Sequence, residues 1–161
     1  MKEITYDEYV KLFDSFGTGL VYIGGNWCYH CENVKDIVLN LAKKHNVEVY
    51  NYDPVFKNIY GEMEDLRDCK SLEIKLKYYA IVEKSGFKSK ELVKDTLIPR
   101  IHVPFYMAIK NGSCVGYYTI ELEKTGDSLH LHGETLDRTE EFKNAIDELL
   151  AKLELDDKFK I

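Results

Sequence analysis

The chain has 161 residues, of which 45% are hydrophobic and 31% are charged, a balance that suits one globular domain spanning residues 1–161. Its formal net charge of −6 argues against nucleic acids and anionic lipid surfaces as partners, because both are bound by basic faces. No stretch approaches the roughly 20 apolar residues of a membrane span. We expect a monomer, and we expect it in the cytoplasm if no signal peptide has been removed, because the acidic N-terminus lacks a signal-like apolar segment.

The first third of the chain predicts a helix, a strand, a second helix and a second strand. The first helix begins at Thr5, which forms a capping box with Glu8. The short apolar run 20–23 lies between glycines and predicts a buried strand. Residues 31–45 carry apolar side chains at helical spacing, and 47–52 alternates as a strand does. A strand–helix–strand unit implies two parallel strands with a right-handed crossover.

The last third predicts a hairpin and a final helix. Residues 105–109 predict a strand, the Asn-Gly pair at 111–112 predicts a tight turn, and 114–122 predicts the returning strand. Asp137 with Glu140 is a second capping box, and it opens an amphipathic helix. Because the hairpin adds antiparallel strands to parallel ones, we expect an α/β fold with a mixed sheet and helices on both faces.

The segment Trp27-Cys28-Tyr29-His30-Cys31 contains a C-x-x-C motif between the first strand and the second helix. Two cysteines three positions apart at a helix start can bond to each other. The Cys28 thiol lies at the positive end of the helix dipole, which favours its nucleophilic thiolate. Cys31, one turn further along, is predicted to attack the mixed disulfide that Cys28 forms and to release the product.

A metal site is a weaker interpretation of these cysteines. A structural zinc site needs four ligands, and no second C-x-x-C exists. We expect no metal. His130 and His132 could form a metal pair only with further ligands, and we interpret them as part of a loop or strand tip. Cys69 and Cys114 are predicted to be buried thiols, although a bridge between them stays open.

Two segments resemble the thioredoxin superfamily. Residues 20–31 resemble the strand and active-site segment of that family, including Trp27 before the first cysteine. Residues 103–112 resemble its cis-proline strand and hairpin turn. The resemblance covers 4–53 and 98–154, and it implies a thioredoxin fold, with 54–97 as an insertion.

The resemblance also implies roles for site residues. Trp27, Val103 and Pro104 would line the substrate groove, with a cis bond before Pro104. A His30 imidazole near Cys28 would stabilise the thiolate and make the pair more oxidising, and Tyr29 could shield the pair or present an aromatic surface. No organic cofactor is implied. The substrates would be protein or peptide disulfides, with a thioredoxin reductase or a small thiol as the electron source.

Three features depart from the family pattern. Tyr22 stands where many thioredoxins carry a buried aspartate, and Val49 stands at a position that is often lysine. Without the carboxylate, general-base help to Cys31 is in doubt. The third departure is the insertion itself.

The insertion is predicted to be helical. The apolar positions between Met63 and Leu72 have helical spacing, whereas 72–78 alternates as a strand does. We favour helices because the flanking Glu and Lys residues are good helix formers, and Ser89 could cap a short helix to Leu97. The insertion could lie over the active-site groove and select substrates, or it could be a surface elaboration on one sheet face.

Two functions from different classes follow. The first is a thiol–disulfide oxidoreductase that contributes to redox homeostasis. The second is a non-catalytic module that senses redox state, similar to family members that accompany bacteriocin transport. Reduction of insulin by dithiothreitol distinguishes them, because only the enzyme would accelerate it.

Overall fold

The computed structural model describes residues 1–68, 70–119 and 136–154; within these ranges, the side chains of residues 29, 30, 33 and 136–139 lie outside the description. The strands are β1 (Lys2–Ile4), β2 (Gly19–Ile23), β3 (Val49–Tyr52), β4 (Val55–Lys57), β5 (Met63–Asp65), β6 (Phe105–Lys110) and β7 (Ser113–Thr119). The helices are α1 (Tyr6–Asp14), α2 (Tyr29–His45), α3 (Leu72–Ser85) and α4 (Leu136–Ala151). No helix within the described ranges is long and apolar enough to cross a membrane.

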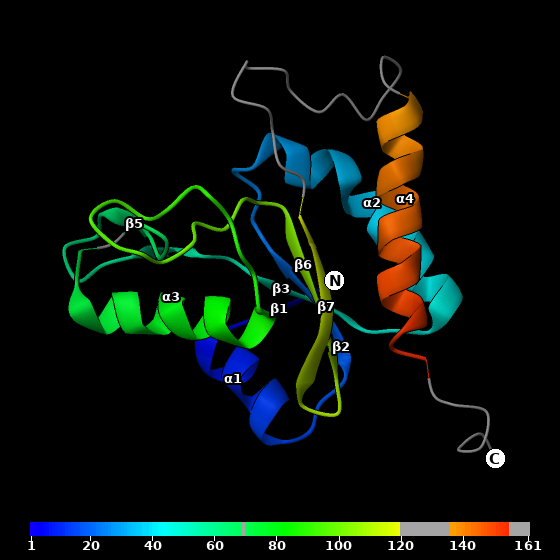
Figure 1. Cartoon of the computed structure of the whole chain (residues 1–161), viewed down its shortest axis with the longest axis horizontal. Helices are drawn as coiled ribbons and strands as arrows, with labels where there is room; N and C mark the ends of the chain where they lie inside the picture. Colours follow the sequence, from blue (N-terminus) through cyan, green and yellow to red (C-terminus); the bar gives the residue numbers. More distant parts are fainter. Residues whose placement is uncertain (69, 120–135, 155–161) are drawn as a thin grey trace.

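Five strands form one mixed sheet in the order β1-β3-β2-β6-β7 (Figure 1). The strands β1, β3 and β2 are parallel, and α2 makes the crossover between β2 and β3. The strand β6 runs antiparallel to β2 and pairs with β7 through a hairpin. Asn111 and Gly112 both have positive φ, 52° and 78°, which confirms the predicted turn.

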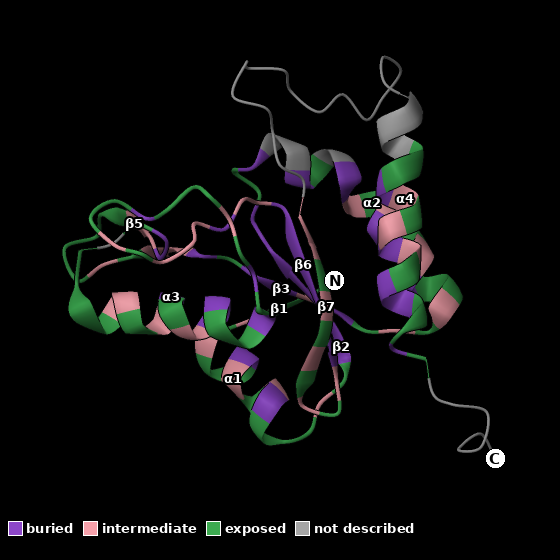
Figure 2. Ribbon diagram, viewed as in Figure 1, coloured by how far each residue is buried: buried purple, intermediate pink, exposed green. Residues whose placement is uncertain are grey.

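The helices cover both faces of this sheet, as predicted (Figure 1). Alternate β2 residues explain how: Leu20 and Tyr22 join one core cluster with α2 and α4, and Val21 and Ile23 join the other with α1 and α3. Buried residues follow the sheet between the helices, while the outer surfaces of the helices are exposed (Figure 2). The capping box of Thr5 is also confirmed.

The insertion contains one of the predicted helices, α3, but is not helical throughout. The strands β4 and β5 form a two-stranded hairpin, so Met63 lies on a strand rather than on a helix. The segment from Ser89 to Leu97 contains turns and a bridge between Leu92 and Pro99 instead of the predicted short helix. The helix predicted from the spacing of apolar residues was wrong here, because strands of three residues are too short to show the two-residue period of a strand.

Smaller differences lie at the ends of the chain. The strand β1, a three-residue edge strand that pairs with β3, was not predicted from the sequence. The helix α4 begins at Leu136, so Asp137 lies inside it rather than before it. Cys114 is a free, half-buried thiol, whereas Cys69 and the two histidines at 130 and 132 lie outside the described residues.

Candidate functional site

Cys28 and Cys31 form a disulfide at the N-terminus of α2, with their Cα atoms 5.2 Å apart. Cys28 is the N-cap residue of this 17-residue helix, and its Sγ accepts a hydrogen bond from the Cys31 backbone N–H at 3.2 Å. In the reduced protein the same N–H and the helix dipole would stabilise a thiolate on Cys28. Cys28 retains 7% exposure and Cys31 only 1%, so an incoming sulfur can approach Cys28 first.

Gly24 lets the end of β2 pass close to this disulfide. A Cβ atom at residue 24 would lie 2.7 Å from Cys31 Sγ and 2.8 Å from Tyr22 Oη. Both distances are shorter than the contacts that Cβ atoms make in proteins, so only glycine fits between the two side chains. The buried side-chain amide of Asn51 holds this turn, because it donates to the carbonyl oxygens of Tyr22 at 3.3 Å and Gly24 at 2.9 Å.

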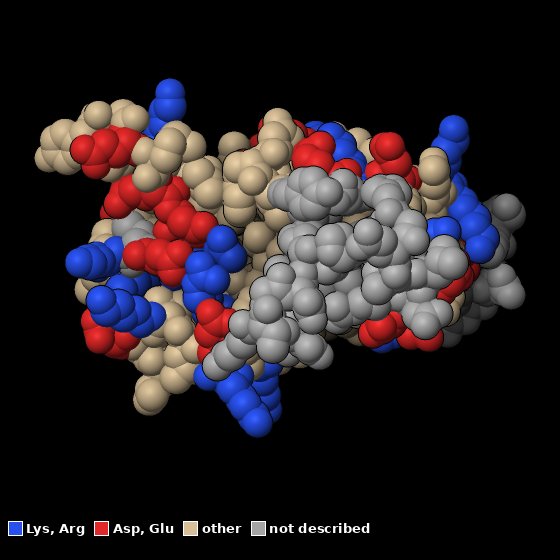
Figure 3. Space-filling view, turned by 90° about the horizontal axis from the view of Figure 1, so that it is seen from above, with Lys and Arg blue, Asp and Glu red and all other residues tan. Residues whose placement is uncertain are grey.

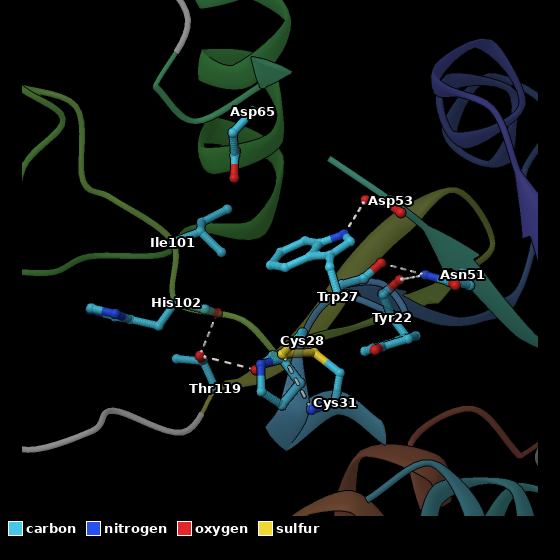
Figure 4. The surroundings of a disulfide bond; sticks show 12 residues. Tyr22, Trp27, Cys28, Cys31, Asn51, Asp53, Asp65, Ile101, His102 and Thr119 are labelled. Carbon is cyan, nitrogen blue, oxygen red and sulfur yellow. Dashed lines mark hydrogen bonds between the residues drawn. A yellow bond between two sulfur atoms is a disulfide. The ribbon is translucent and has the colours of Figure 1, made fainter. Parts of the chain in front are cut away.

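Tyr22 is a buried tyrosine whose hydroxyl faces Cys31 across Gly24 (Figure 4). Burial raises the pKa of the Tyr22 hydroxyl, so it is protonated at neutral pH. Its ring stacks on Tyr106 of the neighbouring strand, with ring centroids 5.5 Å apart. Tyr22 can therefore donate a proton in a hydrogen bond near Cys31, but it cannot act as a base as a carboxylate would.

Trp27 lies directly before Cys28 and is 46% exposed, so it is not ordinary core filling. Its indole Nε1–H donates to Asp53 Oδ1 at 3.0 Å, as Figure 4 shows. The same carboxylate oxygen accepts the backbone N–H of Val55 at 2.9 Å. From the sequence, Asp53 could be assigned only to a turn, since its partner Trp27 is 26 residues away.

The peptide bond between Val103 and Pro104 is cis. The Thr119 hydroxyl lies within hydrogen-bond distance of the carbonyl oxygens of His102, at 2.9 Å, and Pro104, at 3.3 Å, which ties this segment to the end of β7. In the view of Figure 4, His102 and Thr119 lie on the opposite side of the disulfide from Asn51 and Asp53. His102 itself forms an ion pair with Glu91 at 3.2 Å.

The structure thus brings together some of the residues that the sequence singled out. Cys28, Cys31 and Trp27 surround the start of α2, and the segment that leads to Pro104 passes beside them. The backbones of Tyr29 and His30 begin α2, but their side chains lie outside the description, so their tuning roles stay predictions.

Charges over the insertion are mixed. Seen from above, acidic and basic side chains lie side by side over the insertion (Figure 3). Among the described residues, no group of three or more His, Cys, Asp or Glu side chains could hold a metal ion.

The strand order β1-β3-β2-β6-β7, with three parallel strands, an antiparallel hairpin and helices on both faces, decides the fold. The chain has a thioredoxin-like fold. The solved structures that are similar to it include two thioredoxins. Thioredoxin O2 from Arabidopsis thaliana, in its oxidised state, has 13% identity and a TM-score of 0.41, with 89% of this chain and 91% of that chain covered.

The second similar structure is the long form of thioredoxin f from spinach chloroplast, with 17% identity, a TM-score of 0.40 and coverage of 90% and 84% of the two chains. No family model matches the sequence, and no curated protein matches it.

Proposed function

We propose that this protein is a thiol–disulfide oxidoreductase that exchanges its Cys28–Cys31 pair with disulfides of protein or peptide substrates. The observation that carries the proposal is the disulfide at the N-terminus of α2, whose more accessible sulfur already accepts a helix N–H. Such a position favours the thiolate that thiol–disulfide exchange requires.

The proposed reaction has two steps. The Cys28 thiolate attacks one sulfur of the substrate disulfide, forms a mixed disulfide and releases one substrate thiolate, which takes up a proton. The Cys31 thiol then loses its proton, attacks Cys28 Sγ and releases the second substrate thiolate. The substrate gains two electrons, and the protein ends with the disulfide seen in the structure. A reductase protein or a small thiol would return the pair to the dithiol form.

The experiment is dithiothreitol-driven reduction of insulin, measured for the wild type and for three variants in each of which one cysteine is replaced by serine. Cys28→Ser should abolish the acceleration, because the attacking sulfur is gone. Cys31→Ser should keep the attack, and when it is mixed with insulin without dithiothreitol, the substrate should stay bound in a mixed disulfide that can be identified by mass. Cys114→Ser is the matched control, since Cys114 is a free thiol away from the pair, and it should retain activity.

Two results would contradict the proposal: a wild-type protein without acceleration, or full activity in Cys28→Ser. A wild-type protein that is inactive but still oxidises and reduces its disulfide reversibly would support the redox-sensing module instead.

A further inference from the structure

Arg67 follows β5 in the insertion, and its side chain is almost completely buried, with 8% of the residue exposed. Its Nε and Nη2 donate to the two carboxylate oxygens of Asp65 at 3.1 and 2.8 Å. Its Nη1 donates to the backbone carbonyl of Ile101 at 3.0 Å. A planar guanidinium with partners on two sides is fixed in one orientation.

The guanidinium of Arg67 also meets Trp27. Its central carbon lies 6.0 Å from the centroid of the indole ring, within the range of a cation–π contact. The indole nitrogen is bound by Asp53, the residue directly before the insertion. The insertion therefore contacts the ring face of Trp27, the residue before Cys28, and Asp53 binds the indole nitrogen.

The second segment that the insertion holds is the chain before Pro104. Ile101 is 1% exposed, and its backbone N–H donates to the Tyr78 hydroxyl of α3 at 2.8 Å. The Tyr78 hydroxyl in turn donates to the carbonyl of Pro99 at 2.6 Å. Because Arg67 takes the Ile101 carbonyl, both backbone polar groups of Ile101 are bound by the insertion.

We propose that Arg67 is a positioning residue that fixes Trp27 relative to the segment 101–104 and so shapes the groove through which a protein disulfide reaches Cys28. This inference rests on the proposed function. It favours the substrate-selecting interpretation of the insertion over a surface elaboration, because one buried side chain of the insertion touches both Trp27 and Ile101.

The groove should affect large and small disulfide substrates differently. A peptide disulfide carries backbone on both sides of the sulfur that Cys28 attacks. Its binding therefore depends on the positions of Trp27 and the segment 101–104. A small aromatic disulfide needs access only to Cys28 Sγ. Loss of Arg67 should therefore weaken binding of peptide disulfides and leave the reaction with small disulfides nearly unchanged.

The test compares Arg67→Met with wild type on two substrates, a disulfide-bonded peptide and 5,5′-dithiobis(2-nitrobenzoate). Methionine retains the apolar length but donates no hydrogen bonds. We expect KM for the peptide to rise about tenfold or more and kcat/KM for the small disulfide to change by less than about twofold. Trp27 is the only tryptophan, so its fluorescence emission should shift as well.

Arg100→Met is the matched control. It removes a second bidentate ion pair of the same region, in which Arg100 Nε and Nη2 donate to Asp68 at 3.1 and 2.9 Å. Its guanidinium binds Asp68 rather than the Ile101 carbonyl or the Trp27 ring. The KM for the peptide, the kcat/KM for the small disulfide and the tryptophan emission should all stay at the wild-type values.

Arg67→Lys serves if circular dichroism shows that Arg67→Met does not fold. Lysine retains the charge but lacks the fork that reaches Asp65 and Ile101 together, so a smaller rise in peptide KM is expected. If the loss of Arg67 affects both substrates equally, or affects neither, the inference is overturned. The proposed function still stands in that case, provided that the wild-type protein is active. A wild type inactive on both substrates would overturn both.

Discussion

Among single residues, the Tyr22 hydroxyl is a buried polar group beside the pair that the exchange reaction does not itself use. It faces Cys31 Sγ across Gly24, and burial keeps it protonated. When the disulfide is reduced, a protonated hydroxyl can donate a hydrogen bond to the Cys31 sulfur, and this bond is weaker or absent in the oxidised form. Tyr22 should therefore stabilise the dithiol over the disulfide.

Tyr22→Phe removes this donor and retains the ring that stacks on Tyr106. A hydrogen bond contributes about 0.5–1.5 kcal/mol, so the variant should be less oxidising by about 10–30 mV. Equilibration with glutathione buffers measures this shift. The control is Tyr117→Phe, which changes a tyrosine that packs on Phe105, and the prediction is wrong if both variants have the wild-type potential.

Among the elements, α2 and α4 are joined at their ends by His45. Its Nε2 lies 2.7 Å from Asp147 Oδ1, and its Nδ1 is paired with Glu154. The hydrogen bond with Asp147 is the main reason that the pKa of His45 is raised, and the bond with Glu154 adds to it. The sequence placed His45 only at the end of a helix, because both partners are more than 100 residues away.

The raised pKa of His45 makes stability depend on pH. A histidine whose folded pKa exceeds its unfolded value contributes fully below the unfolded pKa, and this contribution is lost as pH rises through the folded pKa. From about pH 6 to about pH 9, the free energy of unfolding should therefore fall by about 0.5–1 kcal/mol from this group. The change is small because Asp147 and Glu154 are nearly half exposed and solvent screens their charges.

Urea unfolding of His45→Gln across this pH range checks the prediction. The variant should lose the part of the pH dependence that His45 supplies. Lys44→Gln removes a neighbouring cation that also pairs with Asp147, at 3.6 Å, but leaves the imidazole of His45 in place, so it should keep the slope. An unchanged slope in His45→Gln would contradict the prediction.

Elements with local signals were predictable, and those that depend on distant contacts were not. The helix α2 ends at His45, as the helical spacing over residues 31–45 predicted, and Asn46 follows it in the left-handed conformation. The hairpin β4–β5 has no such signal, because its three-residue strands depend on packing with the rest of the fold. Within the site, the C-x-x-C was evident, whereas Arg67 was not, since its partner Ile101 is 34 residues away.

In the whole molecule, one sheet separates two cores. Phe142 of α4 is 1% exposed and contacts Tyr106 edge-on in the core that contains the disulfide. The insertion supplies Tyr78 and Ile81 to the core on the opposite face. Because β2 and β6 contribute side chains to both cores, damage to one core should weaken the other, as the predicted single domain requires.

Phe142→Ala tests this single-domain prediction. The variant should lower the free energy of unfolding by about 3–5 kcal/mol, because it removes a buried aromatic ring and leaves a cavity. Hydrogen exchange should show the most protected amides of α2 and of α3 losing the same free energy, since both helices would open only when the shared sheet unfolds. Wild-type protection of α3 in this variant would mean that the insertion folds as a unit of its own.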